Sequence, residues 1–99
     1  MTDYLLAELV DEVYAEYQIP PYTSDKVVSR AVEESAARIG SLAEAVDFGT
    51  DKQARELVKA RAYYVLNHIV DEFEPAYGHV IRAWQLGMEV TDDETDETT

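Results

Sequence analysis

The side chains with the most metal-like spacing in this sequence are His68, Asp71 and Glu72. If this stretch is helical, His68 and Glu72 lie one turn apart on the same face, where both can reach one metal ion. A third ligand of matching quality is missing nearby, and the HExxH pattern of zinc hydrolases does not occur. We therefore favour a polar patch at the edge of a packed helix, and we expect neither a metal site nor a cofactor.

Other residue types that carry catalysis form no recognisable constellation. The absence of cysteine excludes disulfides, thiolate metal sites and cysteine nucleophiles. No serine lies in a nucleophile motif, and no glycine-rich phosphate loop occurs. Adjacent carboxylates such as Glu33 and Glu34 diverge on a helix, which favours a solvated face over a cooperating pair. We expect no catalytic residue and predict that the protein is not an enzyme.

The net charge of −13 is concentrated at the two ends of the chain. Residues 1–22 and 91–99 each carry five acids and no base, whereas residues 23–90 carry eleven acids and eight bases. A chain without a basic face is not expected to bind nucleic acid by neutralising phosphates. The N-terminal MTDYLLAEL has no basic segment, so we expect no signal peptide and a protein used in a cytoplasm, or in a particle assembled there.

The elements that would position these side chains are helices. The first 18 residues place apolar side chains at i, i+3, i+4 spacing, which predicts a helix within residues 1–19 that begins at Thr2 or Asp3. A Pro-Pro linker over residues 20–22 then stops it, because proline lacks the backbone donor and holds the preceding residue extended. The linker is short and stiff, so the first helix can dock at a distance or on a neighbouring subunit.

A second helix is expected to start at Thr23 or Ser24. It either continues through Gly40 or breaks there, and in the second case Ser41 and Glu44 form the capping box of a further short helix. The sequence alone leaves both alternatives open.

The central helix is expected to run from Thr50 to about Phe73, opened by a capping box of Thr50 and Gln53. Its segment Leu57–Val70, LVKARAYYVLNHIV, is mainly apolar on nearly every side. Such a helix is normally buried among other elements, and this one is too short and too interrupted to span a bilayer.

A shorter helix over residues 76–86 completes the core and is expected to stop at Gly87. The predicted fold class is therefore all-α, a small bundle of four helices, or five if the second helix breaks, around the central hydrophobic helix. Residues 1–90 are expected to form one helical domain. The acidic tail, residues 91–99, has no apolar residue and is expected to be disordered.

Seven tyrosines and one tryptophan are many for a small bundle. Tyrosine and tryptophan are enriched at protein interfaces because they bury a large area and keep a polar tip. Several of these tyrosines lie in or beside the first helix and the linker. Two interpretations stay open at this point, ordinary core or boundary residues and members of an interface.

The order of parts resembles a known family. The segments VVSRAVEESAARI, DFGTD, ELVKARAYYVLNHIVDEF and IRAWQLG follow one another within residues 23–87. This arrangement is similar to that of the small all-helical head–tail connector proteins of tailed bacteriophages, also called adaptor or head-completion proteins. The acidic run that usually opens the family is reduced here to Ser24-Asp25, and an additional helix with its Pro-Pro linker precedes it.

The resemblance implies a structural virion protein that forms a homo-oligomeric ring, usually a dodecamer, at the head–tail interface. It implies two partners, the portal protein above the ring and a stopper or tail-completion protein below it. DNA would pass through the channel without specific binding, and no membrane is involved. We expect the intersubunit and portal contacts to come from the first helix, the linker and the C-terminal segment: Leu5, Leu9, Val13, Tyr14, Tyr17, Tyr22, Trp84, Leu86, Met88 and Val90.

Two other functions compete with the connector. An acidic DNA mimic would inhibit a host nucleic-acid-binding protein, but it needs carboxylates spread over the folded surface, and ten of the twenty-one acids lie at the ends of the chain. A general helical interaction module or small regulatory subunit differs from the connector only in its partner. Mass in solution, alone and with a portal protein, separates these hypotheses.

Overall fold

The computed structural model describes residues 1–87 and leaves residues 88–99 undescribed. The described residues form helices α1 (Asp3–Glu16), α2 (Asp25–Gly40), α3 (Lys52–Leu66) and α4 (Phe73–Gln85), with a short 3₁₀ helix η1 (Val70–Glu72) before α4. Within this part of the chain no strand forms, so the predicted all-α bundle of four helices is confirmed. The predicted disordered tail, residues 91–99, lies outside the described residues.

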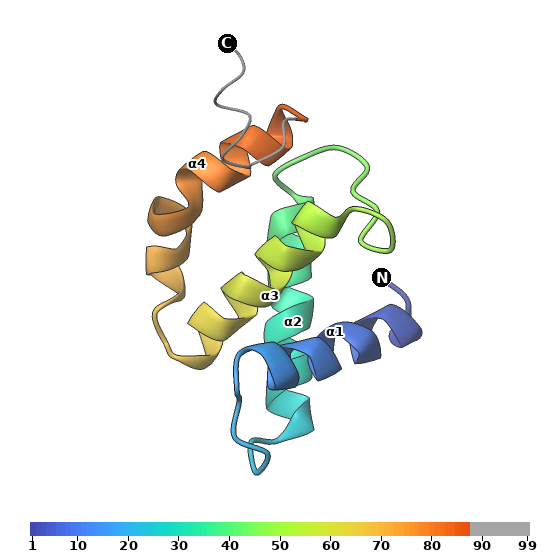
Figure 1. The fold of residues 1–99 in the computed structure, drawn as a ribbon, viewed down its shortest axis with the longest axis vertical. Helices are drawn as coiled ribbons and strands as arrows, with labels where there is room; N and C mark the ends of the chain where they lie inside the picture. Colours follow the sequence, from blue (N-terminus) through green and yellow to red (C-terminus); the bar gives the residue numbers. More distant parts are fainter. Residues whose placement is uncertain (88–99) are drawn as a thin grey trace.

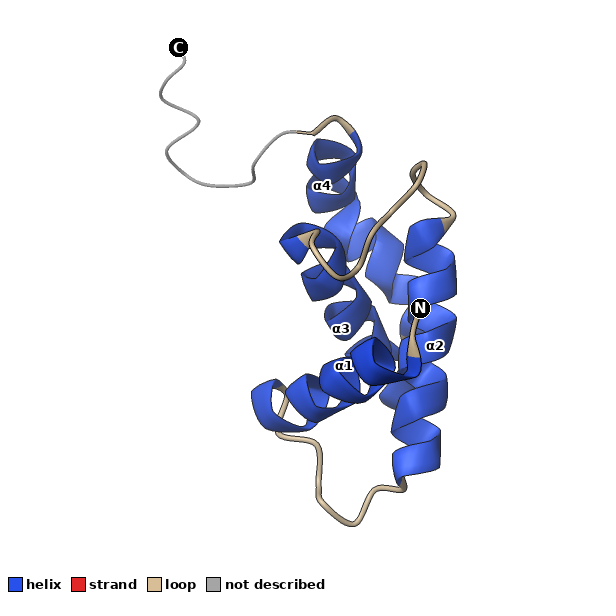
Figure 2. Ribbon diagram, turned by 90° about the vertical axis from the view of Figure 1, so that its right-hand side faces the viewer, coloured by secondary structure: helices blue, strands red, loops and turns tan. Residues whose placement is uncertain are grey.

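The molecule is elongated, with extents of 48 × 25 × 22 Å. Helix α2 runs along the long axis and α1 crosses it (Figure 2). The α1–α2 loop lies at one end of the long axis and the end of α4 at the other (Figure 1). These two ends therefore present different surfaces of the molecule.

Side-chain caps explain where three of the helices begin. Thr2 accepts a hydrogen bond from the backbone N–H of Leu5, and Ser24 accepts one from Lys26, as residues at an N-cap do. Helix α3 is capped by Asp51, which accepts from Ala54 at 3.0 Å. The predicted capping box of Thr50 and Gln53 is therefore wrong by one residue, and the stronger carboxylate acceptor is used.

Helix α2 ends at Gly40, and no helix follows it before α3. The Ser41 hydroxyl donates to the carbonyl of Arg38 at 2.6 Å, and the Ser41 N–H also bonds carbonyls in the last turn. Ser41 therefore closes α2 from its C-terminal side. The alternative with a short helix starting at Ser41 is wrong, and the bundle has four α-helices within residues 1–87.

The apolar central helix predicted from Thr50 to Phe73 is not confirmed. Helix α3 ends at Leu66, where the side chain of Asn67 donates to the carbonyl of Tyr63 and His68 adopts a left-handed backbone with φ of 61°. A left-handed residue cannot continue a right-handed helix. The second half of α3 is also only partly buried, since 37% of Tyr63 is exposed.

Helix α4 begins at Phe73, three residues before the predicted start at residue 76. Pro75 lies in its first turn, where the missing N–H has no helical partner to lose. Gly87 follows the end of the helix with φ of 76°, which matches the predicted glycine stop.

One apolar core joins all four helices. Phe73 is completely buried, and its ring stacks on Tyr77 at 4.6 Å and meets the edge of Tyr64 at 5.4 Å, which fixes α4 on α3. Helix α1, which precedes the Pro-Pro segment in the sequence, packs on α2 and α3 of its own chain. The large aliphatic side chains that are fully buried are Leu9, Val13, Val28, Val32, Ile39, Leu57 and Val58. No helix within residues 1–87 is long and apolar enough to cross a bilayer.

The backbone of the loop between α2 and α3 can be tested by one substitution, alanine to glycine, made at a position in this loop and at a position in α2. Ala45 is exposed and has φ of 52°, which is unfavourable for an L-residue, whereas Ala37 is exposed within α2. Ala45→Gly should leave the free energy of unfolding unchanged or raise it by up to about 1 kcal/mol, because the left-handed strain is removed. Ala37→Gly should lower it by about 1 kcal/mol, because glycine weakens a helix interior.

Urea unfolding followed by circular dichroism measures both values. Equal destabilisation by the two variants would contradict the left-handed turn at Ala45.

Candidate protein-interaction surface

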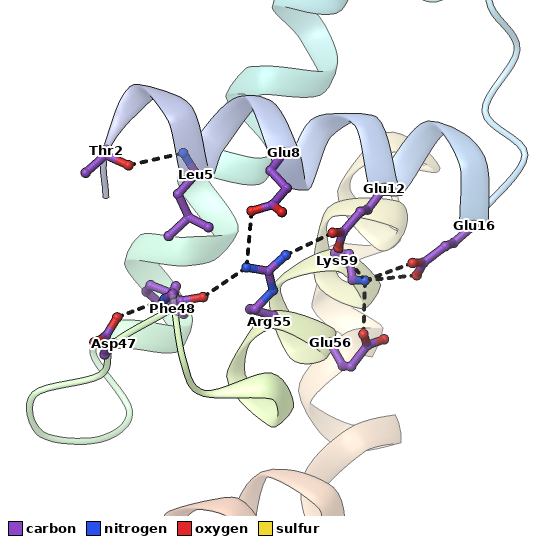
Figure 3. A network of polar contacts seen from close by, with 11 residues as sticks. Thr2, Leu5, Glu8, Glu12, Glu16, Asp47, Phe48, Arg55, Glu56 and Lys59 are labelled. Carbon is purple, nitrogen blue, oxygen red and sulfur yellow. Dashed lines mark hydrogen bonds and ion pairs between the residues drawn. The ribbon is translucent and has the colours of Figure 1, made fainter.

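An ion-pair network holds α1 on α3 (Figure 3). On α1, Glu8, Glu12 and Glu16 are spaced four residues apart and so share one face of the helix. On α3, Arg55 and Lys59 face them. The Lys59 ammonium lies 2.9 Å from carboxylate oxygens of both Glu12 and Glu16. The Arg55 guanidinium lies 2.9 Å from Glu12 and 3.5 Å from Glu8.

Lys59 is the buried member of this network, with only 2% of the residue exposed. Glu56 supplies a third carboxylate at 3.0 Å. Burial acts to lower the pKa of Lys59, but the hydrogen bonds to the three glutamates outweigh it and hold that pKa above its usual range. The hydrogen bond from Lys59 is also the main reason that the pKa of Glu12 lies below its ordinary value. Both groups are therefore charged at neutral pH.

A groove of about 530 Å³ opens just beyond this network. It lies between the α1–α2 loop, the first half of α2 and the end of α3. Largely apolar walls with a few polar groups are typical of binding sites for small or extended ligands. The apolar side chains that line it are Tyr17, Ile19, Pro20, Val27, Ala31, Tyr63, Val65 and Leu66.

Two tyrosines from different helices form one wall of the groove. Tyr17 follows α1, and its ring stacks on Tyr63 of α3 with centroids 5.0 Å apart. Burial raises the pKa of Tyr17 to about 12, so its hydroxyl stays protonated at neutral pH. Because Glu16 precedes Tyr17 and binds Lys59, the ion-pair network also fixes the position of this wall.

The loop at the other side of the groove is a closed turn. The N–H of Thr23 donates to the carbonyl of Pro20 at 2.9 Å, and the Tyr14 hydroxyl donates to the carbonyl of Thr23 at 2.6 Å. The Asp25 carboxylate lies 2.9 Å from the same hydroxyl. The linker predicted as short and stiff is a turn tied to α1, and Tyr22 is 88% exposed at its tip.

The groove carries one basic group outside the internal ion pairs. Arg30 lines it and is exposed, and within residues 1–87 no ion pair involves it. His68 lies exposed at the rim. Glu34 also lines the groove, and its carboxylate lies 3.6 Å from the guanidinium of the largely buried Arg61. Arg61 therefore partly neutralises the negative charge of Glu34. An acidic or neutral partner therefore fits this surface better than a basic one.

The residues predicted from sequence as an interface divide into three groups. Leu9 and Val13 are fully buried and Trp84 is 8% exposed, so these three side chains lie in the core of the monomer. An interface role for them stays a prediction. Their periodic apolar spacing reflects the core of the monomer.

The other predicted positions are placed differently. Leu5, Tyr14 and Tyr17 are half-buried, and of these Tyr17 lines the groove. Tyr22 and Leu86 are exposed, at 88% and 67%, and lie at opposite ends of the chain's fold. The last two predicted positions, Met88 and Val90, lie outside the described residues.

Sequence reasoning missed several groove residues. Val27 continued the apolar stripe of the second helix, yet it is 50% exposed. Tyr63 and Leu66 belonged to a run expected to be buried on all sides. The ion-pair network could have been found from the sequence, because Glu8, Glu12 and Glu16 repeat every four residues. This repeat matches the spacing of Arg55 and Lys59 on α3.

The helix break at His68 separates it from the acids with which it could share a metal ion. His68 follows α3, while Asp71 and Glu72 lie in η1. Within residues 1–87, no three histidines, cysteines or carboxylates come close enough to hold a metal ion.

Lys59 offers a direct test of the network. Lys59→Met keeps the apolar stem but leaves three carboxylates without their common partner, so we expect the free energy of unfolding to fall by about 2 kcal/mol. Lys52→Met is the matched control, because Lys52 is exposed in the first turn of α3 and within residues 1–87 forms no ion pair. Its effect should stay within about 0.5 kcal/mol. Urea unfolding at neutral pH measures both, and equal stabilities would show that the network contributes nothing net.

The lowered pKa of Glu12 predicts how its contribution depends on pH. A carboxyl whose pKa is depressed in the folded state stabilises the fold above its unfolded value, near 4.5, and loses that contribution as pH falls through the folded value. The stability difference between the parent and Glu12→Gln should therefore be largest near neutral pH and shrink below pH 4.5. Urea unfolding across this range measures it.

The control for this pH dependence compares two further chains, Lys59→Met alone and Lys59→Met with Glu12→Gln, by the same stability measurement. There the main cause of the shift is gone, so the Glu12→Gln difference should be smaller and flatter. An unchanged pH dependence in that background would contradict the assigned cause.

No protein-family model, curated protein or solved structure matches this chain.

Proposed function

We propose that this chain is a structural subunit that associates head to tail with copies of itself into a ring, and that the ring is a head–tail connector of a tailed bacteriophage. The observation that carries the proposal is that two different sets of exposed apolar side chains lie at the two ends of an elongated monomer. One is the groove beside the α1–α2 loop, and the other is Leu86, which is 67% exposed after α4. Figure 1 shows the α1–α2 loop and the end of α4 at opposite ends of the long axis.

Two different surfaces at opposite ends favour a particular kind of assembly. A contact between unlike surfaces is heterologous, so each copy can bind one neighbour at each end, and the series closes into a ring when the rotation between copies allows it. A two-fold dimer would instead use one surface twice. Apolar residues exposed near an otherwise polar surface are typical of such contacts.

The rigidity of the monomer also supports a structural role. Lys59 ties α1 to α3, the Arg38 guanidinium ties α2 to Glu74 of α4 at 2.6 Å, and the Trp84 indole donates to Asp51 at 2.9 Å. These bonds join elements far apart in the sequence. A subunit that transmits position between a portal and a tail needs this property more than it needs a flexible site.

The specific connector role is supported by the resemblance of residues 23–87 and by charge. Within residues 1–87 there are fifteen acids and eight bases. A ring of such subunits would present an acidic lumen that does not hold DNA, which suits a channel. The partners in this role are the portal protein and a stopper or tail-completion protein, and the location is the virion.

The competing DNA-mimic function is less well supported by the geometry. Its carboxylates must be free to face a basic protein surface. Instead Glu8, Glu12 and Glu16 face Arg55 and Lys59 of the same chain. A general interaction module differs in forming no ring, so mass in solution distinguishes it.

Light scattering on the full chain over a range of concentrations tests the proposal. We expect an assembly of about twelve subunits of 11.2 kDa, alone or on addition of a portal protein, visible as rings by negative-stain microscopy. Leu86→Glu should reduce its mass, because a charge replaces an exposed apolar contact. Tyr4→Glu, at an exposed residue of α1 outside both surfaces, should not. A monomer that ignores the portal protein would refute the proposal.

A further inference from the structure

We infer that the groove of one copy binds the C-terminal segment of a second copy, with Met88 and Val90 in contact with its apolar walls. The inference deepens the proposed head-to-tail association and rests on it. It names the occupant of the groove and the segment of the neighbour that enters it.

The geometry excludes the same molecule as the source of this segment. The described residues end at Gly87, directly after α4, whereas the groove is lined by the α1–α2 loop. That loop and the end of α4 lie at opposite ends of a 48 Å axis (Figures 1 and 2). Met88 and Val90 follow Gly87 by one and three residues. Three residues span at most about 11 Å even when fully extended, so these side chains can reach only the groove of another copy.

The spacing of the apolar residues fits an extended segment. Leu86, Met88 and Val90 alternate with Gly87 and Glu89, and alternate residues of an extended chain share one face. Leu86 is already 67% exposed where the fold ends, so it adds to this face. Gly87 lies between Leu86 and Met88, and its left-handed backbone ends the helical geometry of α4 at the start of the alternating segment.

Charge complements the apolar contact. Acids follow Val90 at residues 92, 93, 94, 96 and 97. At the groove, Arg30 is exposed and makes no ion pair within residues 1–87, and the exposed His68 lies at the rim. An apolar segment with acids after it would therefore place the acids beside the available base. The contact should weaken as ionic strength rises, because exposed charges are screened.

Each copy then contributes one groove and one C-terminal segment. The contact is heterologous, so it propagates from copy to copy and can close a ring. Leu86, exposed in the monomer, becomes part of that contact, and Val27 and Tyr63 lose their exposed area against it.

A peptide-binding measurement tests the inference directly. The probe is a fluorescein-labelled synthetic peptide of residues 86–99, titrated by fluorescence anisotropy with the full chain carrying Met88→Asp and Val90→Asp. That receptor keeps its groove, and its own segment can no longer compete. We expect saturable binding, and no binding of a peptide that carries the same two substitutions.

Matched variants of the receptor locate the contact. Val27→Glu should weaken peptide binding by at least about tenfold, because it places a charge against the apolar side chains of the bound peptide. The monomer should tolerate the substitution, because Val27 is 50% exposed when the groove is empty. Arg30→Glu should also weaken binding and reduce its dependence on salt. Tyr4→Glu and Lys52→Glu alter exposed residues elsewhere and should leave binding unchanged. Circular dichroism and thermal unfolding establish that each variant is folded.

A mixing experiment then tests the heterologous geometry. The Val27→Glu chain keeps a C-terminal segment, and the Met88→Asp, Val90→Asp chain keeps a groove. Each should be monomeric alone, and an equimolar mixture should form a one-to-one dimer and nothing larger, measured by light scattering.

The outcomes separate the two proposals. Absence of peptide binding, or binding that Val27→Glu does not weaken, overturns the inference even if the parent chain forms rings through another contact. Groove-dependent peptide binding with a parent chain that forms dimers or open chains but no closed ring upholds the contact between segment and groove and refutes the ring. A parent chain that stays monomeric at all concentrations overturns both.

Discussion

The burial of the Lys59 ammonium between α1 and α3 is the interaction on which the rest of this structure depends. An unpaired ammonium in this position would be costly, so α3 can pack here only when α1 brings its carboxylates to the same place. The position of α1 then fixes Tyr17, and Tyr17 with Tyr63 forms a wall of the groove. The ion pairs of Lys59 thus determine the shape of the groove, although Lys59 does not line it.

The helical class and the approximate helix positions could be predicted from the sequence, because periodic apolar spacing and caps act locally. Thr2, Ser24 and Gly87 lie where their side chains or backbone preferences suggest. The errors occur where two local signals compete. Asp51 replaces its neighbour Thr50 as the cap of α3, and the left-handed His68 ends a helix that the apolar run alone would continue.

The groove could not be predicted for a different reason. Whether an apolar residue is covered depends on which elements pack over it, and that is a property of the tertiary arrangement. Leu9 and Val27 look alike in their stripes, but Leu9 is fully buried whereas Val27 lines the groove and is 50% exposed. The tyrosines showed the same ambiguity, since Tyr77 is partly buried against Phe73 and Tyr22 is exposed at the tip of a turn.

The distribution of charge connects these observations to assembly. Of the acids of α1, Glu8, Glu12 and Glu16 are paired within the fold with Arg55 and Lys59. The sequence after Val90 holds five acids and no base, and Arg82 is the one arginine or lysine of α4. The groove end keeps Arg30 exposed, and the α4 end leads into the most acidic stretch of the chain. In the assembly that we propose, this difference in charge would favour contacts between unlike ends. It would therefore favour a head-to-tail order over a two-fold pairing.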